Sequence, residues 1–164
     1  MSKTIKKILI IIIIIVLAIV ILSRLKTVIL KKIYPIKYAE IINKYSLEYE
    51  VDPLLVLAII KAESNFKEES VSTQKAVGLM QLMEETAKEL AEKIGMDYEE
   101  GKTLYEPEKN IRLGAKYISE LLEKYDGNYM LALAAYNAGI GNVNKWIENG
   151  IIKEDRFRYR KYPF

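Results

Sequence analysis

The chain has 164 residues, no His and no Cys, and a formal net charge of +3. This composition excludes Ser-His-Asp and Cys-His triads, two-His zinc motifs, thiolate metal sites and disulfides. Residues 1–32 hold seven of the 25 basic side chains and none of the 22 acidic ones, which leaves residues 33–164 with a net charge of −4 and argues against nucleic-acid binding. A hydrolase or lyase that works through carboxylates, without metal or cofactor, is the simplest enzyme that remains.

The N-terminal segment is an apolar run of 15 residues, 8–22. Basic residues flank it on both sides: Lys6, Lys7, Arg24 and Lys26. Extended to residues 5–25, with the flanking side chains reaching the interface, it has the roughly 20 residues that a membrane span needs. A cleaved signal peptide is the alternative, but no small-x-small cleavage site follows Leu22. We therefore predict an uncleaved transmembrane signal anchor in residues 1–32, followed by one globular domain in residues 33–164.

The globular part is predicted to be helical nearly throughout, because no segment alternates apolar and polar residues as a strand does. Tyr34-Pro35 marks a break after the anchor. Asp52-Pro53 is typical of a helix start and Gly95 of a helix end. The expected helices cover residues 36–48, 53–63, 79–94, 106–125, 131–138 and 142–148, with a loop at 67–75.

Glu63 is the candidate general acid. It follows the apolar run 54–60, at the C-terminal end of a helix predicted to be buried. Desolvation and the negative end of the helix dipole both raise the pKa of a carboxyl in this position. A carboxylic acid that is still protonated near neutral pH can donate a proton to a leaving oxygen. A lone Glu near a helix end is more often a solvated surface residue, so other motifs have to support this role.

Two further segments combine small residues with polar side chains: 76–83 and 133–139. Gly78 permits close backbone approach, and Gln81 offers a donor and an acceptor to a sugar or an amide. Alone, this segment is better explained as a turn followed by a helix. Tyr136 and Asn137 place polar groups at the end of an apolar helix, where Glu63 would be a fitting partner for the hydroxyl. Alone, these two are better explained as a satisfied core Tyr and an Asn C-cap.

Taken together, the motifs resemble those of a known family. Glu-Ser-x-Phe at 63–66, Gly-Leu-Met-Gln at 78–81 and Ala-Tyr-Asn-Ala-Gly at 135–139 follow in the order of the soluble lytic murein transglycosylase (SLT) family of lysozyme-like enzymes. Ser72 and Thr86-Ala87 also stand at the family's spacing. Residues 104–114 resemble the family's Leu-x-Asp/Glu-Pro-x-x-Asn-Ile-x-x-Gly segment. The resemblance covers about residues 38–150.

Three positions depart from the family's pattern. Lys75 stands where the family commonly has Gly, and Glu84 where it commonly has Pro. Tyr162-Pro163-Phe164 resembles the Ile-Pro-Phe that usually precedes a Lys-Glu-Thr-Arg-x-Tyr helix, which closes one side of the groove. Without that helix, either weaker substrate binding or a less stable fold is expected.

The resemblance implies a mainly α, lysozyme-like helical domain with a substrate groove. It implies that Glu63 alone performs both proton transfers at the β-1,4 bond between N-acetylmuramic acid (MurNAc) and N-acetylglucosamine (GlcNAc), giving a 1,6-anhydro product from peptidoglycan glycan strands. Five residues match family positions that bind substrate: Ser72, Gln81, Met83, Tyr136 and Asn137. Of these, Tyr136 is expected to orient Glu63. Because peptidoglycan lies outside the cytoplasmic membrane, the domain is expected on the extracytoplasmic side of a single-pass membrane protein.

Two alternatives stay open. A lysozyme-type muramidase would keep the fold and use water in place of the muramoyl 6-hydroxyl. A wall-associated protein that binds glycan without cleaving it would keep the fold and lose turnover.

Overall fold

The computed structural model describes residues 11–22, 24–25 and 38–152. The chain divides into two compact units, Met1–Lys37 and Tyr38–Phe164. In the first unit, residues 11–22 form a helix whose apolar side chains are exposed. Among the described residues, none of the helices combines the length and the apolar character needed to cross a membrane. Three predicted features lie outside the described residues: residues 1–10, 23 and 26–32 of the anchor, the Tyr34-Pro35 break, and the Tyr162-Pro163-Phe164 end.

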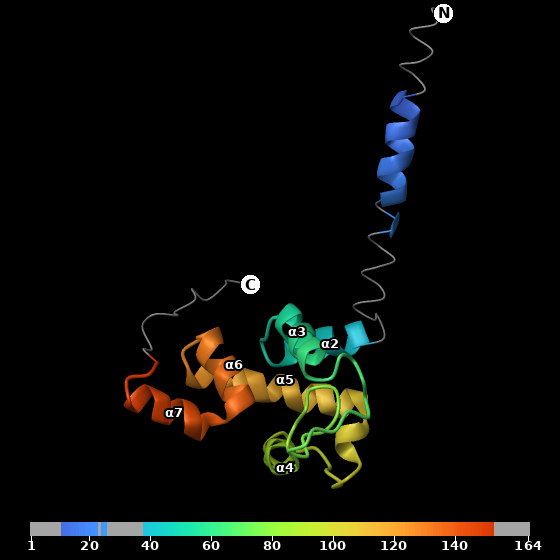
Figure 1. Cartoon of the computed structure of the whole chain (residues 1–164). Coiled ribbons are helices and arrows are strands. Elements are labelled where there is room, and N and C mark those ends of the chain that lie inside the picture. The colour runs from blue at the N-terminus through green and yellow to red at the C-terminus, as the bar shows by residue number, and fades with distance from the viewer. Residues whose placement is uncertain (1–10, 23, 26–37, 153–164) are drawn as a thin grey trace, which may run out of the picture. The chain divides into compact units, whose positions relative to one another are not determined.

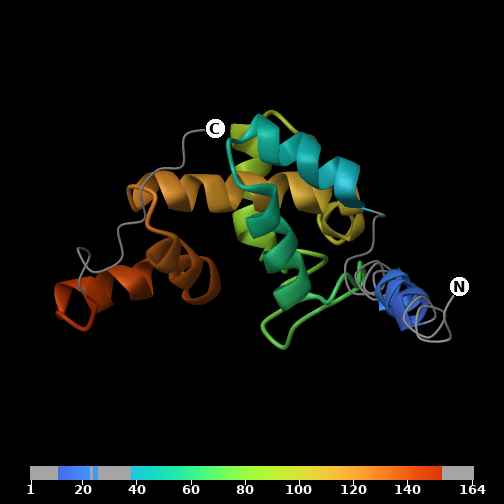
Figure 2. The ribbon, with the colours of Figure 1, turned by 90° about the horizontal axis from the view of Figure 1, so that it is seen from above.

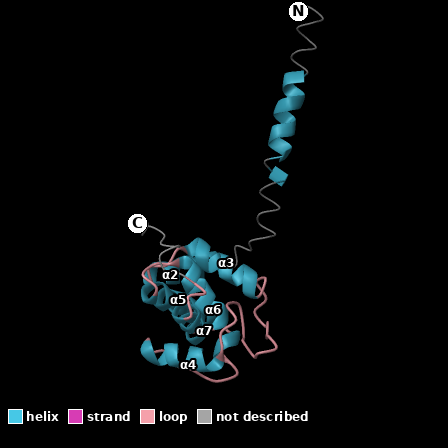
Figure 3. Cartoon of the chain, turned by 60° about the vertical axis from the view of Figure 1, so that its left-hand side comes forward, coloured by secondary structure: helices cyan, strands magenta, loops and turns pink. Residues whose placement is uncertain are grey.

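The second unit is helical, as Figure 3 shows. Its helices are α2 (Ala39–Glu48), α3 (Pro53–Glu63), α4 (Glu84–Lys93), the 3₁₀ turn η2 (Thr103–Tyr105), α5 (Pro107–Lys124), α6 (Tyr129–Ala138) and α7 (Ile140–Glu148) (Figure 1). The long helix α5 runs through the middle of the unit and contacts α2, α4 and α6 (Figure 2). The described residues contain isolated β-bridges but no strand. The prediction of a mainly α domain is therefore confirmed.

Local capping sets several helix boundaries where the sequence predicts them. The Asp52 carboxylate accepts a hydrogen bond from the Leu54 N–H at 2.8 Å, and Pro53 needs no partner in the first turn of α3. Helix α5 likewise begins at Pro107. At the end of α4, the Met96 N–H bonds to the Ala91 carbonyl at 2.8 Å, which closes the helix around Gly95.

The predicted helix 79–94 is wrong in its first turn, because α4 begins only at Glu84. Val77 and Leu82 exchange backbone hydrogen bonds of 2.9 and 3.1 Å, so the chain reverses between them. Gln81 has a left-handed backbone, with φ at 48°, which ends any helical path there. Leu79, Met80 and Leu82 are all buried in this turn. Their apolar run therefore looked like the start of a helix.

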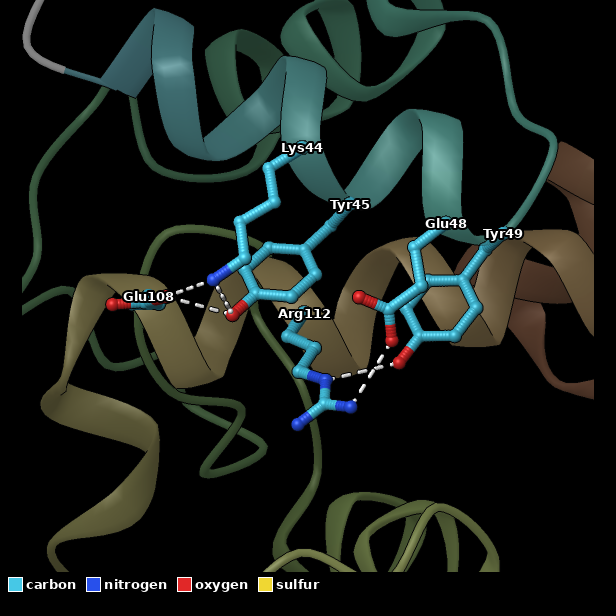
Figure 4. Close-up of polar contacts among 6 residues, drawn as sticks. All are labelled: Lys44, Tyr45, Glu48, Tyr49, Glu108 and Arg112. Atoms are coloured by element: carbon cyan, nitrogen blue, oxygen red, sulfur yellow. Dashed lines mark hydrogen bonds and ion pairs between the residues drawn. The ribbon is translucent and has the colours of Figure 1, made fainter.

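Two clusters of buried side chains form the core. The larger one joins α2, α3, α5, α6 and α7, and the smaller one lies between α4, α5 and the turn at 77–82. Polar contacts add to the packing of α2 on α5: Arg112 bonds to the Tyr49 hydroxyl and the Glu48 carboxylate, both at 3.0 Å (Figure 4). The end of α3 and the turn at 77–82 are thus both fixed to the framework built on α5.

Candidate active site

Glu63 is the last residue of α3 and its side chain is half-buried. Within the part of the chain that the structure describes, its carboxyl has no hydrogen bond and no ion pair. Burial alone raises the pKa of Glu63 above its ordinary value. The expected direction of this shift is therefore confirmed. Such a carboxyl can hold a proton at a pH where an exposed Glu has lost it.

The loop after Glu63 turns sharply away from α3. The buried Ser64 hydroxyl donates back to the Ile60 carbonyl at 3.1 Å. Asn65 and Phe66 then take left-handed backbone conformations, with φ at 51° and 64°. These turns end the helix directly after the carboxyl and keep Glu63 at its tip.

Ser72 lies farther along the same loop and is half-buried. Its backbone N–H bonds to the Ala76 carbonyl at 2.9 Å, and its hydroxyl oxygen accepts from the Ala76 N–H at 3.0 Å. The hydroxyl hydrogen has no acceptor among the described residues, so Ser72 can still donate to a ligand.

Gln81 fastens the loop to the turn. Its amide nitrogen donates to the Ser70 and Gly78 carbonyls, both at 2.9 Å. These two bonds use both amide hydrogens, so the expectation that Gln81 also donates to a ligand is wrong in this conformation. Its carbonyl oxygen remains as an acceptor.

Asn110 is a positioning residue to which the sequence motifs assigned no role. It is fully buried in α5, and its amide oxygen accepts from the Met80 N–H at 2.8 Å. Its amide nitrogen donates to the Val77 and Leu104 carbonyls at 3.0 and 2.9 Å. The signal that could have identified it is a lone amide within an otherwise apolar helix stripe, because a buried amide needs several partners.

Gly78 allows this close packing. A Cβ at this position would lie 2.1 Å from the Asn110 amide nitrogen and 2.3 Å from the Leu104 carbonyl oxygen. Its φ of +83° is also one that glycine adopts readily. The expected close backbone approach at Gly78 is therefore confirmed.

Tyr136 of α6 contacts the same turn from another side. Its hydroxyl donates to the Met80 carbonyl at 2.7 Å, and its ring packs against Tyr117 with 5.2 Å between centroids. The Met80 carbonyl thus takes the hydrogen of this hydroxyl, and the predicted role of Tyr136 in orienting Glu63 stays a prediction. Burial raises the pKa of Tyr136, and the charge of Glu63 raises it further, which places the two groups near each other.

The remaining candidates are more exposed. Met83 is exposed and precedes α4 as its N-cap, and the Asn137 side chain is exposed near the end of α6. Neither side chain has a hydrogen bond to another described residue. The residue that caps the C-terminus of α6 is Gly139, so an Asn C-cap at Asn137 is wrong. The structure thus joins Ser72, Gln81 and Tyr136 through one loop and turn, but it does not connect Met83 or Asn137 to them.

Two acidic side chains near the motifs, Glu68 and Glu84, have partners of their own, and Glu69 and Glu85 are exposed. Glu68 accepts from the Tyr38 hydroxyl, and Glu84 accepts from the Tyr98 hydroxyl and the Gly101 N–H. Over the described ranges, no three His, Cys, Asp or Glu side chains gather in a way that could hold a metal ion. Glu63 is therefore the carboxyl in this region best suited to move a proton.

Comparison with known proteins gives the family. The model of the Transglycosylase SLT domain matches residues 40–156. The chain is 32% identical over 137 residues to the soluble lytic murein transglycosylase of Salmonella typhimurium. This alignment covers 82% of this chain and 21% of that protein. It is 36% identical over 116 residues to the membrane-bound lytic murein transglycosylase C of Edwardsiella ictaluri, covering 65% and 32% respectively.

A solved structure agrees with these matches. The X-ray structure of an inactive Glu→Gln mutant of the lytic transglycosylase Slt from Pseudomonas aeruginosa has a TM-score of 0.68 and 36% sequence identity, covering 73% of this chain and 20% of that one. The chain spans about a fifth of the length of the soluble relatives it matches. With the fold, the motifs and the family model in agreement, the chain belongs to the Transglycosylase SLT domain family.

Proposed function

We propose that this chain is a membrane-anchored peptidoglycan lytic transglycosylase in which Glu63 is the single general acid and base. The observation that carries the proposal is the half-buried Glu63 carboxyl, which has a raised pKa and no partner among the described residues. Family membership supplies the substrate class, because the matched relatives are named as lytic murein transglycosylases.

The proposed reaction begins with a proton transfer from Glu63 to the oxygen of the MurNAc–GlcNAc β-1,4 bond. The bond between that oxygen and the muramoyl C1 breaks, and the substrate's own N-acetyl group stabilises the oxocarbenium-like centre. Glu63, now a carboxylate, takes the proton from the muramoyl 6-hydroxyl as its oxygen bonds to C1. A 1,6-anhydro end forms, Glu63 regains its proton, and no water is consumed.

The neighbouring side chains are assigned roles that fit their hydrogen bonds. Ser72 donates its hydroxyl hydrogen to substrate, and Gln81 accepts through its carbonyl oxygen. Tyr136 holds the Met80 peptide and offers its hydroxyl oxygen to the protonated Glu63. Met83 and Asn137 supply an exposed apolar and an exposed amide contact to the glycan. The groove that receives the strand is proposed to run past these side chains.

A related enzyme supports the role of a single glutamate. The Pseudomonas aeruginosa lytic transglycosylase, which is 36% identical to this chain over the fifth of its length that aligns, was solved as an inactive Glu→Gln mutant. Loss of one carboxyl inactivates that protein. We assign the same importance to Glu63 here.

The proposed anchor rests on the 15-residue apolar run and on the exposed apolar side chains of residues 11–22. A matched relative from Edwardsiella ictaluri is named as membrane-bound. Because the substrate lies outside the cytoplasmic membrane, we place the N-terminus inside and residues 38–164 on the extracytoplasmic side. Protease added to spheroplasts should therefore digest this unit, and its full protection would contradict the orientation.

The deciding experiment is mass spectrometry of purified peptidoglycan digested by the full chain in detergent, beside its Glu63→Gln variant. Anhydro-muropeptides from the wild type alone would support the transglycosylase and the role of Glu63. Products heavier by one water would identify the alternative muramidase. If neither protein yields products but both sediment with peptidoglycan, the chain is a glycan-binding protein.

A further inference from the structure

Tyr38 lies outside the sequence motifs, yet its side chain contacts the loop that follows Glu63. It is the N-cap residue of α2 and is 3% exposed. Its ring stacks on the Phe66 ring, with 6.4 Å between centroids and 7° between planes. Its hydroxyl donates to the Glu68 carboxylate at 2.5 Å. One side chain from another helix thus contacts this loop at two points.

The loop that Tyr38 contacts, residues 64–68, begins with an energetically unfavourable backbone conformation. Asn65 and Phe66 are consecutive non-glycine residues with left-handed φ values. Such conformations cost free energy and persist only where surrounding contacts hold them. Lys61 supports the turn from α3, through the Asn65 side chain and the face of the Phe66 ring. Tyr38 supports it from α2.

The position of Glu63 depends on this turn. The carboxyl has no partner of its own among the described residues, so the backbone at the end of α3 decides where it lies. We propose that Tyr38 is a positioning residue for Glu63: its ring and hydroxyl hold residues 64–68 in the conformation that fixes the carboxyl at the tip of α3. This inference rests on the proposed function, in which Glu63 is the general acid.

The test compares Tyr38→Leu with Tyr45→Leu in the full chain. Tyr45 is a matched control, because it is equally buried in the same helix but contacts Tyr49 and Glu108 instead of the loop. Tyr38→Leu is expected to lower kcat on soluble glycan strands by about tenfold or more, with KM nearly unchanged, because a displaced acid no longer meets the bond. Tyr45→Leu is expected to keep kcat at a comparable loss of Tm.

The pH profile gives a readout that a loss of stability alone does not change. A loosened turn admits water to Glu63, which reduces the burial that raises the pKa of Glu63. The alkaline limb of the profile should therefore move to lower pH in Tyr38→Leu and stay in place in Tyr45→Leu. Tyr136 of α6 is the titratable group whose pKa responds to Glu63, and both variants retain it.

If Tyr38→Leu does not fold, the hydroxyl bond is tested alone. Tyr38→Phe and Glu68→Leu should each lower kcat by about threefold, the worth of one hydrogen bond, and the double variant should be no slower than either single one. Additive losses, or wild-type kcat in both, would overturn the proposal. A folded Tyr38→Leu with wild-type kcat and pH profile would overturn it as well.

Hydrogen exchange separates this proposal from the assigned reaction. Amides of residues 64–68 should exchange faster in Tyr38→Leu than in Tyr45→Leu, and this measurement needs no turnover. If these amides exchange faster in Tyr38→Leu but the wild type is inactive, the contact of Tyr38 with the loop is supported and the proposed reaction is contradicted. If exchange is the same in both variants but the wild type is active, the role of Tyr38 is contradicted and the proposed reaction is not.

Discussion

Glu63 combines two properties that a proton-transfer group needs. It is buried enough for its pKa to be raised, yet no described side chain neutralises it or takes its proton. The Asn110 amide and the Tyr136 hydroxyl both form hydrogen bonds with backbone atoms of the turn at 77–82. At the residue scale, the site therefore combines one unpaired acid with a turn whose backbone is held by buried side chains.

The pH dependence of activity follows from this separation. The first step of the proposed reaction needs protonated Glu63, so kcat should fall as the pH rises through the raised pKa of Glu63. Glu63→Gln should lose about a thousandfold in kcat below that pKa, and the difference should narrow as the wild type loses its proton at higher pH. The exposed Glu92→Gln serves as a matched control and should keep the wild-type profile. An unchanged kcat in Glu63→Gln would contradict the assignment.

Stability should respond to the same group. Because the pKa of Glu63 is higher in the folded than in the unfolded chain, the folded state binds more protons. The contribution of Glu63 to the free energy of unfolding is thus fully present below the ordinary carboxyl pKa and is lost as the pH rises through the raised value. Thermal melts should show the Tm of Glu63→Gln rising relative to the wild type across this window, and a difference that is constant with pH would argue against it.

Asn110 is the second test at this scale. Asn110→Ala leaves the buried Met80 N–H and the Leu104 carbonyl without this partner, and removes one of the two donors to the Val77 carbonyl, which still accepts from the Leu82 N–H. We expect a loss of about 3 kcal/mol in the free energy of unfolding, measured by chemical denaturation. The exposed Asn43→Ala is the control and should stay within about 0.5 kcal/mol of the wild type. Equal effects in the two variants would show that the amide does not hold the turn.

At the element scale, α5 is the helix to which α2 and the turn at 77–82 are fixed. Asn110 ties the turn at 77–82 to it, and α2, whose N-cap residue supports the loop after Glu63, lies along it. Polar groups at this contact include Lys44 and Glu108 as well as Arg112 with Tyr49 and Glu48 (Figure 4). The pair Lys44–Glu108 is more than half exposed, so Arg112 is expected to contribute more to docking.

Arg112→Met tests this contact between α2 and α5. The variant keeps the apolar stem but loses the two hydrogen bonds to Tyr49 and Glu48, so we expect a loss of about 1–2 kcal/mol in the free energy of unfolding. Lys109→Met is the control on the same helix, because its ion pair with Glu106 is local and exposed, worth less than about 0.5 kcal/mol. Equal losses in urea titrations would mean that α2 docks through its apolar side chains alone.

At the scale of the whole molecule, the chain combines a basic, apolar N-terminal segment with an acidic helical unit. Exposed apolar side chains occur in both units, but they are contiguous only in residues 11–22. In the helical unit, Leu47 and Leu54 are scattered surface positions of the kind found on ordinary soluble domains. Only the first segment is therefore expected to hold the protein on a membrane.

The anchor can be tested by alkaline carbonate extraction of membranes. The full chain should stay in the membrane pellet, whereas Ile13→Lys combined with Leu17→Lys should release it, because two charges in the centre of a span cost about 5 kcal/mol or more. Leu47→Lys combined with Leu54→Lys adds the same charge to exposed positions of the helical unit and should leave the partition unchanged. Release of the wild type by carbonate would contradict the anchor.

Features that depend on neighbouring residues could be predicted from the amino-acid sequence. Asp52-Pro53 starts α3 and Gly95 ends α4, because capping joins groups that are only a few positions apart. The mainly α fold and the raised pKa of Glu63 followed from apolar runs and their lengths. Three motifs in order were enough to indicate the family.

Features that depend on residues far apart in the chain became visible in the folded molecule. Tyr136 donates to the Met80 carbonyl, 56 positions away, and Asn110 bonds to the Met80 N–H, 30 positions away. These bonds, with the exchange between Val77 and Leu82, hold a turn where the apolar pattern alone predicted a helix. A buried polar group takes whichever partner folding brings within reach, so its identity is a property of the packed molecule and not of the local sequence.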